Sequence, residues 1–118
     1  LIEYGMSSYS LEEYNEAEEA FIQAMTLNPD SYIPYYYLGL LGYNKEDYAS
    51  AEYYYHAAIQ SGGNAPLVYY ALGVNAYADN RNSDATFYLN QATSLDPEGF
   101  KEKASALLAR IEAAGEKE

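Results

Sequence analysis

The sequence has no cysteine, no tryptophan and one histidine, and its 6 basic residues stand against 18 acidic ones. The lack of cysteine excludes disulfides and thiol chemistry but leaves the redox compartment open. A formal net charge of −12 repels phosphate groups, so nucleic acid and anionic membranes are poor partners. No apolar run approaches the length of a membrane span, and the residues after Leu1 do not resemble a basic, apolar export signal.

Motifs for catalysis and metal binding are also missing. His56 has no nucleophile or carboxylate at a recognisable spacing, so we interpret it as a surface or structural histidine. No glycine-rich phosphate loop or zinc spacing occurs. Acidic residues are dense near the N-terminus but lack a calcium-loop pattern, which favours a solvated helix face: Glu12, Glu13, Glu16, Glu18 and Glu19. We therefore expect no catalytic residue, no metal and no cofactor, and a protein that is not an enzyme.

What the chain does have is enough apolar residues for a core and an excess of tyrosine. Its 118 residues, 49% hydrophobic and 20% charged, are typical of one ordinary soluble domain. Sixteen of them are tyrosines, which are large apolar plates with a polar edge. Such residues can fill a core or form a binding surface, so each tyrosine has to be assigned to one role or the other.

An internal repeat of 34 residues runs through the sequence. Glycine recurs at Gly5, Gly39 and Gly73, and a bulky residue recurs at Phe21, Tyr55 and Leu89. Two series of alanines keep the same register: Ala17, Ala51 and Ala85, then Ala24, Ala58 and Ala92. The unit closes with Leu-Asn-Pro at 27–29 and Leu-Asp-Pro at 95–97, and the central copy has Ser-Gly-Gly at 61–63.

This pattern resembles the tetratricopeptide repeat (TPR) family over residues 1–97. The resemblance implies an all-α protein, a right-handed α-solenoid of three helix-turn-helix hairpins with a C-terminal capping helix. In one domain of residues 1–118, it places repeat 1, N-terminally truncated, at 1–31, repeat 2 at 32–65, repeat 3 at 66–97 and the cap at 98–115. The family is specific for a fold, and it does not by itself name a function.

The residues support these hairpins independently of the family. First helices are expected at about 1–10, 32–44 and 65–79, and second helices at about 13–27, 47–61 and 83–95. Small residues such as Gly39, Gly42 and Ala51 allow two helices to approach closely. We expect four tyrosines to fill the hairpin core: Tyr14, Tyr35, Tyr48 and Tyr55.

The C-terminal segment reads as a capping helix, which a solenoid needs to cover its last repeat. One apolar stripe contains Phe100, Ala104, Leu107, Leu108 and Ile111, and Gly115 is the expected stop. At the other end the first hairpin lacks its opening residues. We therefore expect either a trimmed preceding repeat or an excerpt of a longer protein, which could be exported or anchored.

The first helices carry a second apolar stripe beside the one that packs inside each hairpin. In TPR proteins this side lines the concave groove that binds partners, and the resemblance implies the same here, with Tyr9, Tyr43 and Tyr77 as a ladder. The candidate groove residues are Met6, Tyr9, Ile33, Tyr36, Tyr37, Leu40, Tyr43, Asn44, Leu67, Tyr70, Val74 and Tyr77. Tyr53, Tyr54, Phe87 and Tyr88, on the second helices, indicate contacts between repeats or a convex patch.

A groove with almost no charge favours an extended or helical peptide with apolar or aromatic anchors. Some TPR relatives instead hold the acidic C-terminus of chaperones with Lys, Arg and Asn. The matching positions here cannot bind a carboxylate ionically: Ile2, Met6, Tyr37, Leu67 and Ala71. We predict a non-catalytic protein-interaction scaffold, with a secretion-type chaperone for apolar segments or a self-assembly module as alternatives. The expected partner is a protein or peptide, with self-association through the N-terminal edge left open and the compartment cytoplasmic or periplasmic.

Overall fold

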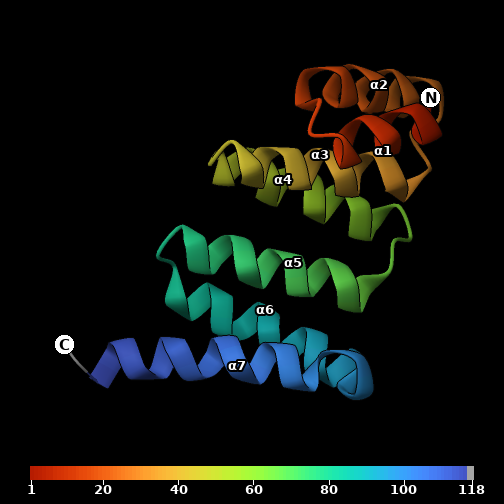
Figure 1. Ribbon diagram of the computed structural model, residues 1–118. Coiled ribbons are helices and arrows are strands. Elements are labelled where there is room, and N and C mark those ends of the chain that lie inside the picture. Colours follow the sequence, from red (N-terminus) through yellow and green to blue (C-terminus); the bar gives the residue numbers. More distant parts are fainter. Residues whose placement is uncertain (117–118) are drawn as a thin grey trace. The chain divides into compact units, whose positions relative to one another are not determined.

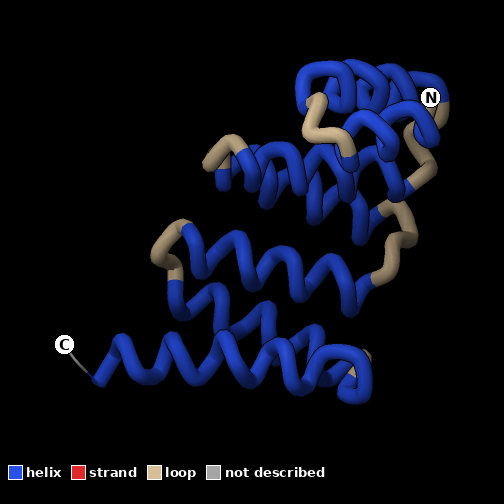
Figure 2. Tube along the Cα trace, in the orientation of Figure 1, coloured by secondary structure: helices blue, strands red, loops and turns tan. Residues whose placement is uncertain are grey.

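The computed structural model describes residues 1–116, and these form seven helices with no strand among them (Figures 1 and 2). The helices are α1 (Ile2–Ser10), α2 (Tyr14–Leu27), α3 (Tyr32–Asn44), α4 (Tyr48–Gln60), α5 (Ala65–Ala78), α6 (Asn82–Leu95) and α7 (Pro97–Glu116). The all-α prediction is confirmed, and each helix boundary lies within one residue of its expected position.

The chain divides into two compact units, Leu1–Gly63 and Asn64–Glu118. In the first unit, α1 pairs with α2, α3 pairs with α4, and α2 packs against α3. We refer to these two pairs as hairpin 1 and hairpin 2. In the second unit, α5 pairs with α6 and α7 packs mainly against α6.

Each pair of helices is held together by one contact that recurs with the repeat. The aromatic ring of Phe21 lies where a Cβ atom on Gly5 would be, at 2.8 Å. Tyr55 faces Gly39 in the same way at 2.5 Å, and Leu89 faces Gly73 at 2.7 Å. Because glycine has no side chain, the bulky residue of the second helix can lie directly on the backbone of the first.

The turns inside the three hairpins share a backbone conformation that the sequence did not indicate. Glu12, Glu46 and Asn80 have positive φ angles of 61°, 62° and 62°. In the second hairpin, the N–H of Glu46 donates to the Tyr43 carbonyl at 3.0 Å, and the N–H of Asp47 donates to the Gly42 carbonyl at 2.8 Å. This pair of hydrogen bonds is a Schellman motif, which usually places glycine at the left-handed position. Here glutamate or asparagine adopts that conformation.

The prediction for the core tyrosines is confirmed for Tyr55 and in part for Tyr14, which packs against the core cluster of hairpins 1 and 2. Tyr55 is 1% exposed, whereas Tyr14, Tyr35 and Tyr48 remain partly exposed. Tyr14 and Tyr48 are the first residues of α2 and α4, so their side chains lie at the ends of the hairpins, where the hydroxyl groups can reach water. Alanine fills most of the remaining close contacts, since Ala17, Ala51 and Ala85 are fully buried.

The capping helix has nearly the predicted bounds. Gly115, the expected stop, is still helical, and the last described helical residue is Glu116. The predicted apolar stripe does face the protein: Ala104 is buried, and Phe100, Leu107, Leu108 and Ile111 are half-buried. Lys101, Lys103 and Arg110 are exposed, as expected for the polar side of such a helix.

We expect Gly39→Ala to destabilise the protein by about 1–3 kcal/mol, because a methyl group there would overlap the Tyr55 ring. Urea unfolding monitored by circular dichroism measures this change. Gly115→Ala is the matched control, since a Cβ atom at Gly115 meets nothing within 4 Å. It should be neutral or slightly stabilising through helix propensity. Equal effects of the two substitutions would contradict the proposed close contact.

Burial raises the pKa of the Tyr55 hydroxyl well above its ordinary value of 10.0, and the neighbouring Tyr36 adds to the shift. The unfolded chain therefore loses this proton first, and the native state should lose stability as the pH rises above about 10. Each further pH unit corresponds to about 1.4 kcal/mol for a fully shifted group. Tyr55→Phe should move the alkaline unfolding midpoint, measured by circular dichroism, to higher pH. An unchanged midpoint would contradict this role.

Removal of residues 98–118 should expose the apolar side of α6 that α7 covers. We expect lower solubility and a markedly lower melting temperature, measured by differential scanning fluorimetry. A truncated protein as stable and soluble as the full chain would show that α7 is dispensable.

Candidate functional site

The twelve predicted groove residues all keep some exposure to solvent. Met6 and Asn44 are exposed, and the other ten are half-buried. The neighbouring stripe on α3 behaves differently, since Leu38, Leu41 and Gly42 are buried. Leu38 and Leu41 pack in one cluster with Ala17 and Phe21 of α2. Of the stripe predicted to pack inside the hairpin, Leu38, Gly39 and Gly42 are buried and Tyr35 is partly exposed.

The open residues fall into two groups, one in each compact unit. The α1–α3 face consists of Met6, Tyr9, Ile33, Tyr36, Tyr37, Leu40, Tyr43 and Asn44. The α5 face consists of Leu67, Tyr70, Val74 and Tyr77.

Aromatic rings form a continuous array beneath and within the α1–α3 face. Tyr37 stacks on Phe21 with ring centroids 4.8 Å apart and 9° between the planes. Its other neighbours are edge-on: Tyr9 at 5.5 Å and Tyr36 at 5.6 Å. Tyr36 in turn lies 6.0 Å from Tyr55. Tyr36 and Tyr37 thus connect the hairpin cores to the open surface, and their rings are held in place by these neighbours.

A hydrogen bond links hairpins 1 and 2 at the edge of this face. The side-chain amide of Asn44 donates to the Tyr9 hydroxyl at 3.0 Å. The two residues are 35 positions apart, so no local sequence pattern could have revealed the bond. Tyr43 instead packs edge-on against Tyr48, with centroids 6.1 Å apart. Asn44 thus fixes the orientation of one tyrosine of the predicted ladder, and Tyr48 contacts another.

Met6 borders an open depression on α1. Ser7, Ser10 and Leu11 line the rest of it, and its volume is about 390 Å³. Two hydroxyl groups and two apolar side chains therefore surround a surface that carries no charge.

Burial raises the pKa of the Tyr36 hydroxyl, and the neighbouring hydroxyls of Tyr37 and Tyr9 act in the same direction. A tyrosine hydroxyl is protonated at neutral pH even at its ordinary pKa, and this shift moves its titration further from neutral. A protonated phenol can donate a hydrogen bond as well as accept one. The face thus offers a neutral donor within an aromatic surface.

The α5 face contains a contact that sequence reasoning missed. Tyr70 lies 5.6 Å from Phe100 of α7, with the ring planes tilted by 36°. In the 34-residue register Phe100 takes the position of Pro66, so the repeat pattern alone did not predict an aromatic partner for Tyr70. Leu67, Val74 and Tyr77 are half-buried along the same helix.

The second helices also expose aromatic side chains. Tyr53 on α4 is 70% exposed and Phe87 on α6 is 56% exposed. Each forms an edge-on pair with the next residue in the chain: Tyr53 with Tyr54 at 5.5 Å, and Phe87 with Tyr88 at 5.6 Å. These pairs occupy the same position in their repeats, one in each unit.

The described residues include no candidate metal site. Within residues 1–116, no group of three or more His, Asp or Glu side chains could hold a metal ion. Nor is any helix in this part of the chain both long and apolar enough to cross a membrane. The chemistry of the site is therefore that of aromatic rings, hydroxyls and one exposed amide.

The fold of this chain is similar to that of solved structures, two of which are described here. The type III secretion translocator chaperone SycD of Yersinia enterocolitica, crystallised as an alternative dimer, is 18% identical to this chain, with a TM-score of 0.88. The match covers 98% of this chain and 91% of that one. The N-terminal domain of stress-induced protein-1 from C. elegans is 14% identical over 93% of this chain and 90% of its own, with a TM-score of 0.79.

Comparison of the sequence with family models matches a shorter part of the chain. Residues 1–31 match the sequence model of the family described as tetratricopeptide repeat. No curated protein matches the sequence significantly. The recognition of tetratricopeptide repeats from the 34-residue period is confirmed, and this chain is built from helical repeats of that type.

Proposed function

We propose that this protein is a non-catalytic interaction module that binds an extended or helical peptide with apolar or aromatic anchors. The binding surface is the α1–α3 face, and the α5 face is a further surface of the same kind on the second unit. The observation that carries the proposal is the partial exposure of all twelve stripe residues on helices whose neighbouring stripe is buried. An apolar stripe left partly open on a soluble protein favours contact with a partner.

The chemistry of the α1–α3 face supports an apolar peptide over a charged one. None of its eight members carries an ionisable acid or base other than a tyrosine hydroxyl. Rings fixed by their neighbours, as Tyr37 is by Phe21, lose little conformational freedom when a ligand binds. The Tyr36 hydroxyl and the Asn44 amide can orient a peptide backbone through hydrogen bonds.

The fold supports the broader part of this proposal. Both structural neighbours have this helical-repeat fold, and one of them is a translocator chaperone by its description. A chaperone role for apolar segments is the second candidate, because SycD matches almost the whole length of this chain. Such a role would use the same open stripe to cover a longer apolar segment instead of a short peptide motif.

Selection of a random 12-residue peptide library against the folded protein tests the proposal. We expect enriched peptides to carry Leu, Phe, Pro or Met anchors. Tyr43→Ala should weaken binding of the best peptide by roughly tenfold or more, because an aromatic hot spot contributes about 2 kcal/mol. Isothermal titration calorimetry measures this loss, and circular dichroism shows whether the variant remains helical.

Tyr53→Ala is the control, because it removes an exposed tyrosine from a second helix. Its affinity for the peptide should equal that of the original protein. Enrichment of charged peptides without apolar anchors would contradict the proposal, as would unchanged binding by a folded Tyr43→Ala variant. Loss of binding in Tyr53→Ala instead would move the binding surface to the second helices.

Sedimentation over a range of protein concentrations tests the remaining alternative, which is a self-assembly module. A self-assembly module should form larger species as its concentration rises, whereas a peptide-binding adaptor or a chaperone without ligand need not. A stable monomer at high concentration would therefore leave the two binding functions and exclude self-assembly by this chain alone.

A further inference from the structure

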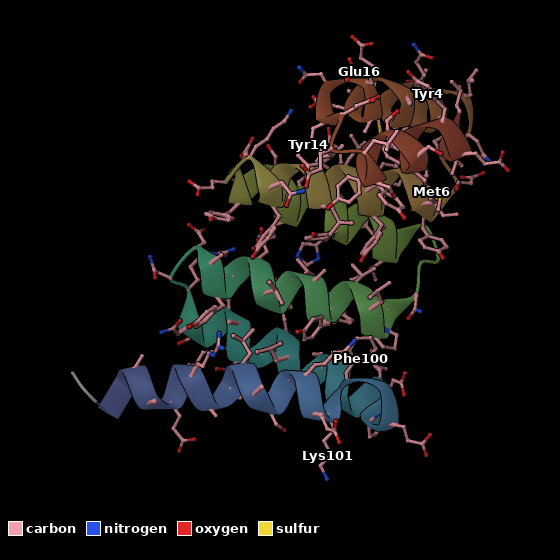
Figure 3. All side chains as sticks on the ribbon, in the orientation of Figure 1. Tyr4, Met6, Tyr14, Glu16, Phe100 and Lys101 are labelled. Atoms are coloured by element: carbon pink, nitrogen blue, oxygen red, sulfur yellow. The ribbon has the colours of Figure 1, made fainter. Side chains whose placement is uncertain are left out.

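The first compact unit, Leu1–Gly63, is strongly acidic. It contains ten acidic residues and a single basic one, Lys45. Five of the acidic residues lie between Glu12 and Glu19, and Figure 3 shows one of them, Glu16, projecting from α2 into solvent. A cationic group is therefore attracted to this unit, and an anionic group is repelled.

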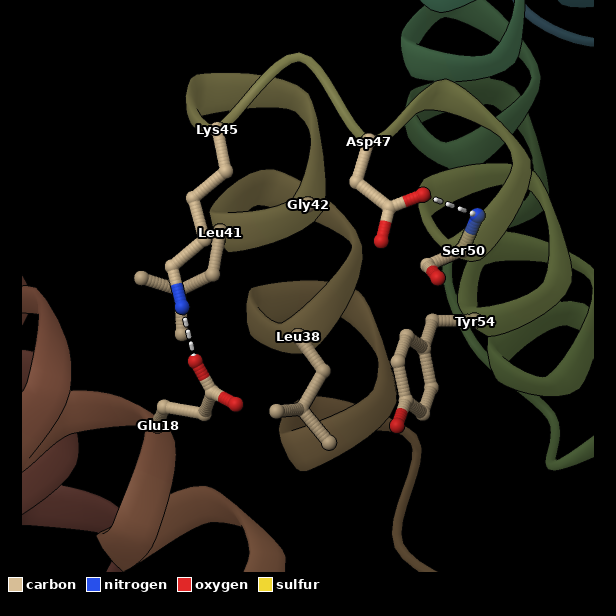
Figure 4. A pocket seen from close by; sticks show the side chains of 8 residues that line it. All are labelled: Glu18, Leu38, Leu41, Gly42, Lys45, Asp47, Ser50 and Tyr54. Atoms are coloured by element: carbon tan, nitrogen blue, oxygen red, sulfur yellow. Dashed lines mark hydrogen bonds and ion pairs between the residues drawn. The ribbon is translucent and has the colours of Figure 1, made fainter.

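A pocket of about 140 Å³ opens between α2, α3 and α4 of this unit (Figure 4). Its back wall is made of apolar residues of α3: Leu38, Leu41 and Gly42. Polar side chains stand on both sides of that wall, Lys45 with Glu18 on one side and Asp47 with Tyr54 on the other. We refer to this site as the α2–α4 pocket. None of the residues that line it belongs to the α1–α3 face.

The charges of the α2–α4 pocket are not balanced. Lys45 forms an ion pair with Glu18, so these two charges neutralise each other. Asp47 is the N-cap of α4, and its Oδ1 atom accepts a hydrogen bond from the Ser50 N–H at 3.3 Å. Within the described residues, Asp47 has no ion-pair partner. Its exposed carboxylate leaves the pocket with a net negative charge.

Tyr54 adds an aromatic ring and a hydroxyl group beside the carboxylates. Its ring forms an edge-on pair with the exposed ring of Tyr53. Burial raises the pKa of the Tyr54 hydroxyl, and the carboxylates of Glu18 and Asp47 act in the same direction. This effect requires both carboxylates to lie close to the hydroxyl. A cation that enters the pocket would therefore meet an aromatic face and acceptor oxygens together.

This combination suits a guanidinium group better than an ammonium group. A guanidinium donates several hydrogen bonds in one plane, and its flat face stacks on aromatic rings. The methylene groups of an arginine side chain can lie on an apolar surface while the charged end stays among polar groups. The chain's own Lys45 already places an ammonium group against Glu18. The remaining position, beside Asp47 and Tyr54, combines a carboxylate with a ring.

We propose that the α2–α4 pocket binds an arginine side chain of a partner protein. The guanidinium group lies between Asp47 and Tyr54, and the methylene groups lie against Leu38 and Leu41. The ligand is a side chain and not free arginine, because the acidic unit would repel the α-carboxylate of the free amino acid. The site is separate from the α1–α3 face, so either proposal can fail alone.

A capped arginine, N-acetylargininamide, tests the site in the full chain. The protein is isotopically labelled, and its amide resonances are followed by NMR during the titration. The Ser50 amide should report binding directly, because it donates to the Asp47 carboxylate. The neutral isostere N-acetylcitrullinamide should bind roughly fivefold or more weakly, because hydrogen bonds between charged groups are about twice as strong as neutral ones.

Asp47→Asn removes the charge but preserves the cap, because asparagine caps a helix about as well as aspartate does. It should weaken binding of N-acetylargininamide roughly fivefold or more. Asp96→Asn is the matched control, since Asp96 accepts a hydrogen bond from the Gly99 N–H at 3.1 Å at the start of α7. The two variants have the same net charge, and the affinity of the control should equal that of the original protein.

Lys45→Met provides a second test, with the opposite sign. It removes the positive charge that neutralises Glu18 and keeps a side chain of similar length. The capped arginine should bind roughly twofold or more tightly to this variant, because a like charge is lost from the pocket. Tyr43→Ala, which tests the α1–α3 face, should leave this binding unchanged.

Four results would overturn the proposal. Equal binding of the citrulline compound would show that charge plays no part. Equal effects of Asp47→Asn and Asp96→Asn would show that the pocket is not the site. Weaker binding by a Lys45→Met variant that circular dichroism shows to be folded would mean that the lysine itself holds the ligand. Tighter binding of free arginine than of the capped compound would make a free amino acid the ligand.

Discussion

The structure depends on a direct contact in each hairpin, where a bulky side chain of the second helix lies on a glycine of the first helix. Phe21, Tyr55 and Leu89 each lie on a glycine of the preceding helix, at a distance that no Cβ atom would permit. This contact sets the separation of the two helices in every hairpin. Fully buried alanines on the second helices, such as Ala17 and Ala51, add further close contacts. Four partly buried tyrosines pack against the core cluster of hairpins 1 and 2 while keeping some exposure to solvent: Tyr9, Tyr14, Tyr37 and Tyr54.

The two flanks of helix α1 in hairpin 1 differ in chemistry. A first helix packs one stripe inside the hairpin, which leaves two flanks. On one flank, Tyr9 joins the aromatic array with Tyr37. On the other, Tyr4 stands beside the acidic residues of α2. One flank is neutral and aromatic, and the other combines the tyrosine ring with the carboxylates of Glu16 and Glu19.

Much of the fold could be predicted because each position of the repeat can be compared with the equivalent positions in the other two copies. The helix boundaries and the close approach of Gly39 to the second helix were predictable from small and bulky residues at a fixed period. The partial exposure of Tyr14, Tyr35 and Tyr48 was not predictable, because helical phase does not show how near a residue lies to the end of a hairpin. Contacts outside the repeat register, such as Asn44 with Tyr9 and Tyr70 with Phe100, also depend on tertiary structure. The candidate site was therefore predictable as a stripe, but not in its internal contacts.

The left-handed residues in the hairpin turns have a consequence for how this chain can change in evolution. Each turn has one such residue, whose backbone N–H donates to a carbonyl three residues earlier: Glu12, Glu46 and Asn80. All three residues are exposed. An L-residue in this conformation costs about 1–2 kcal/mol, which the hairpins tolerate. Because nothing packs tightly around such a side chain, its charge can be altered without disturbing the helices. The turns are thus positions where sequence drift can adjust the electrostatic character of the protein while its packing stays the same.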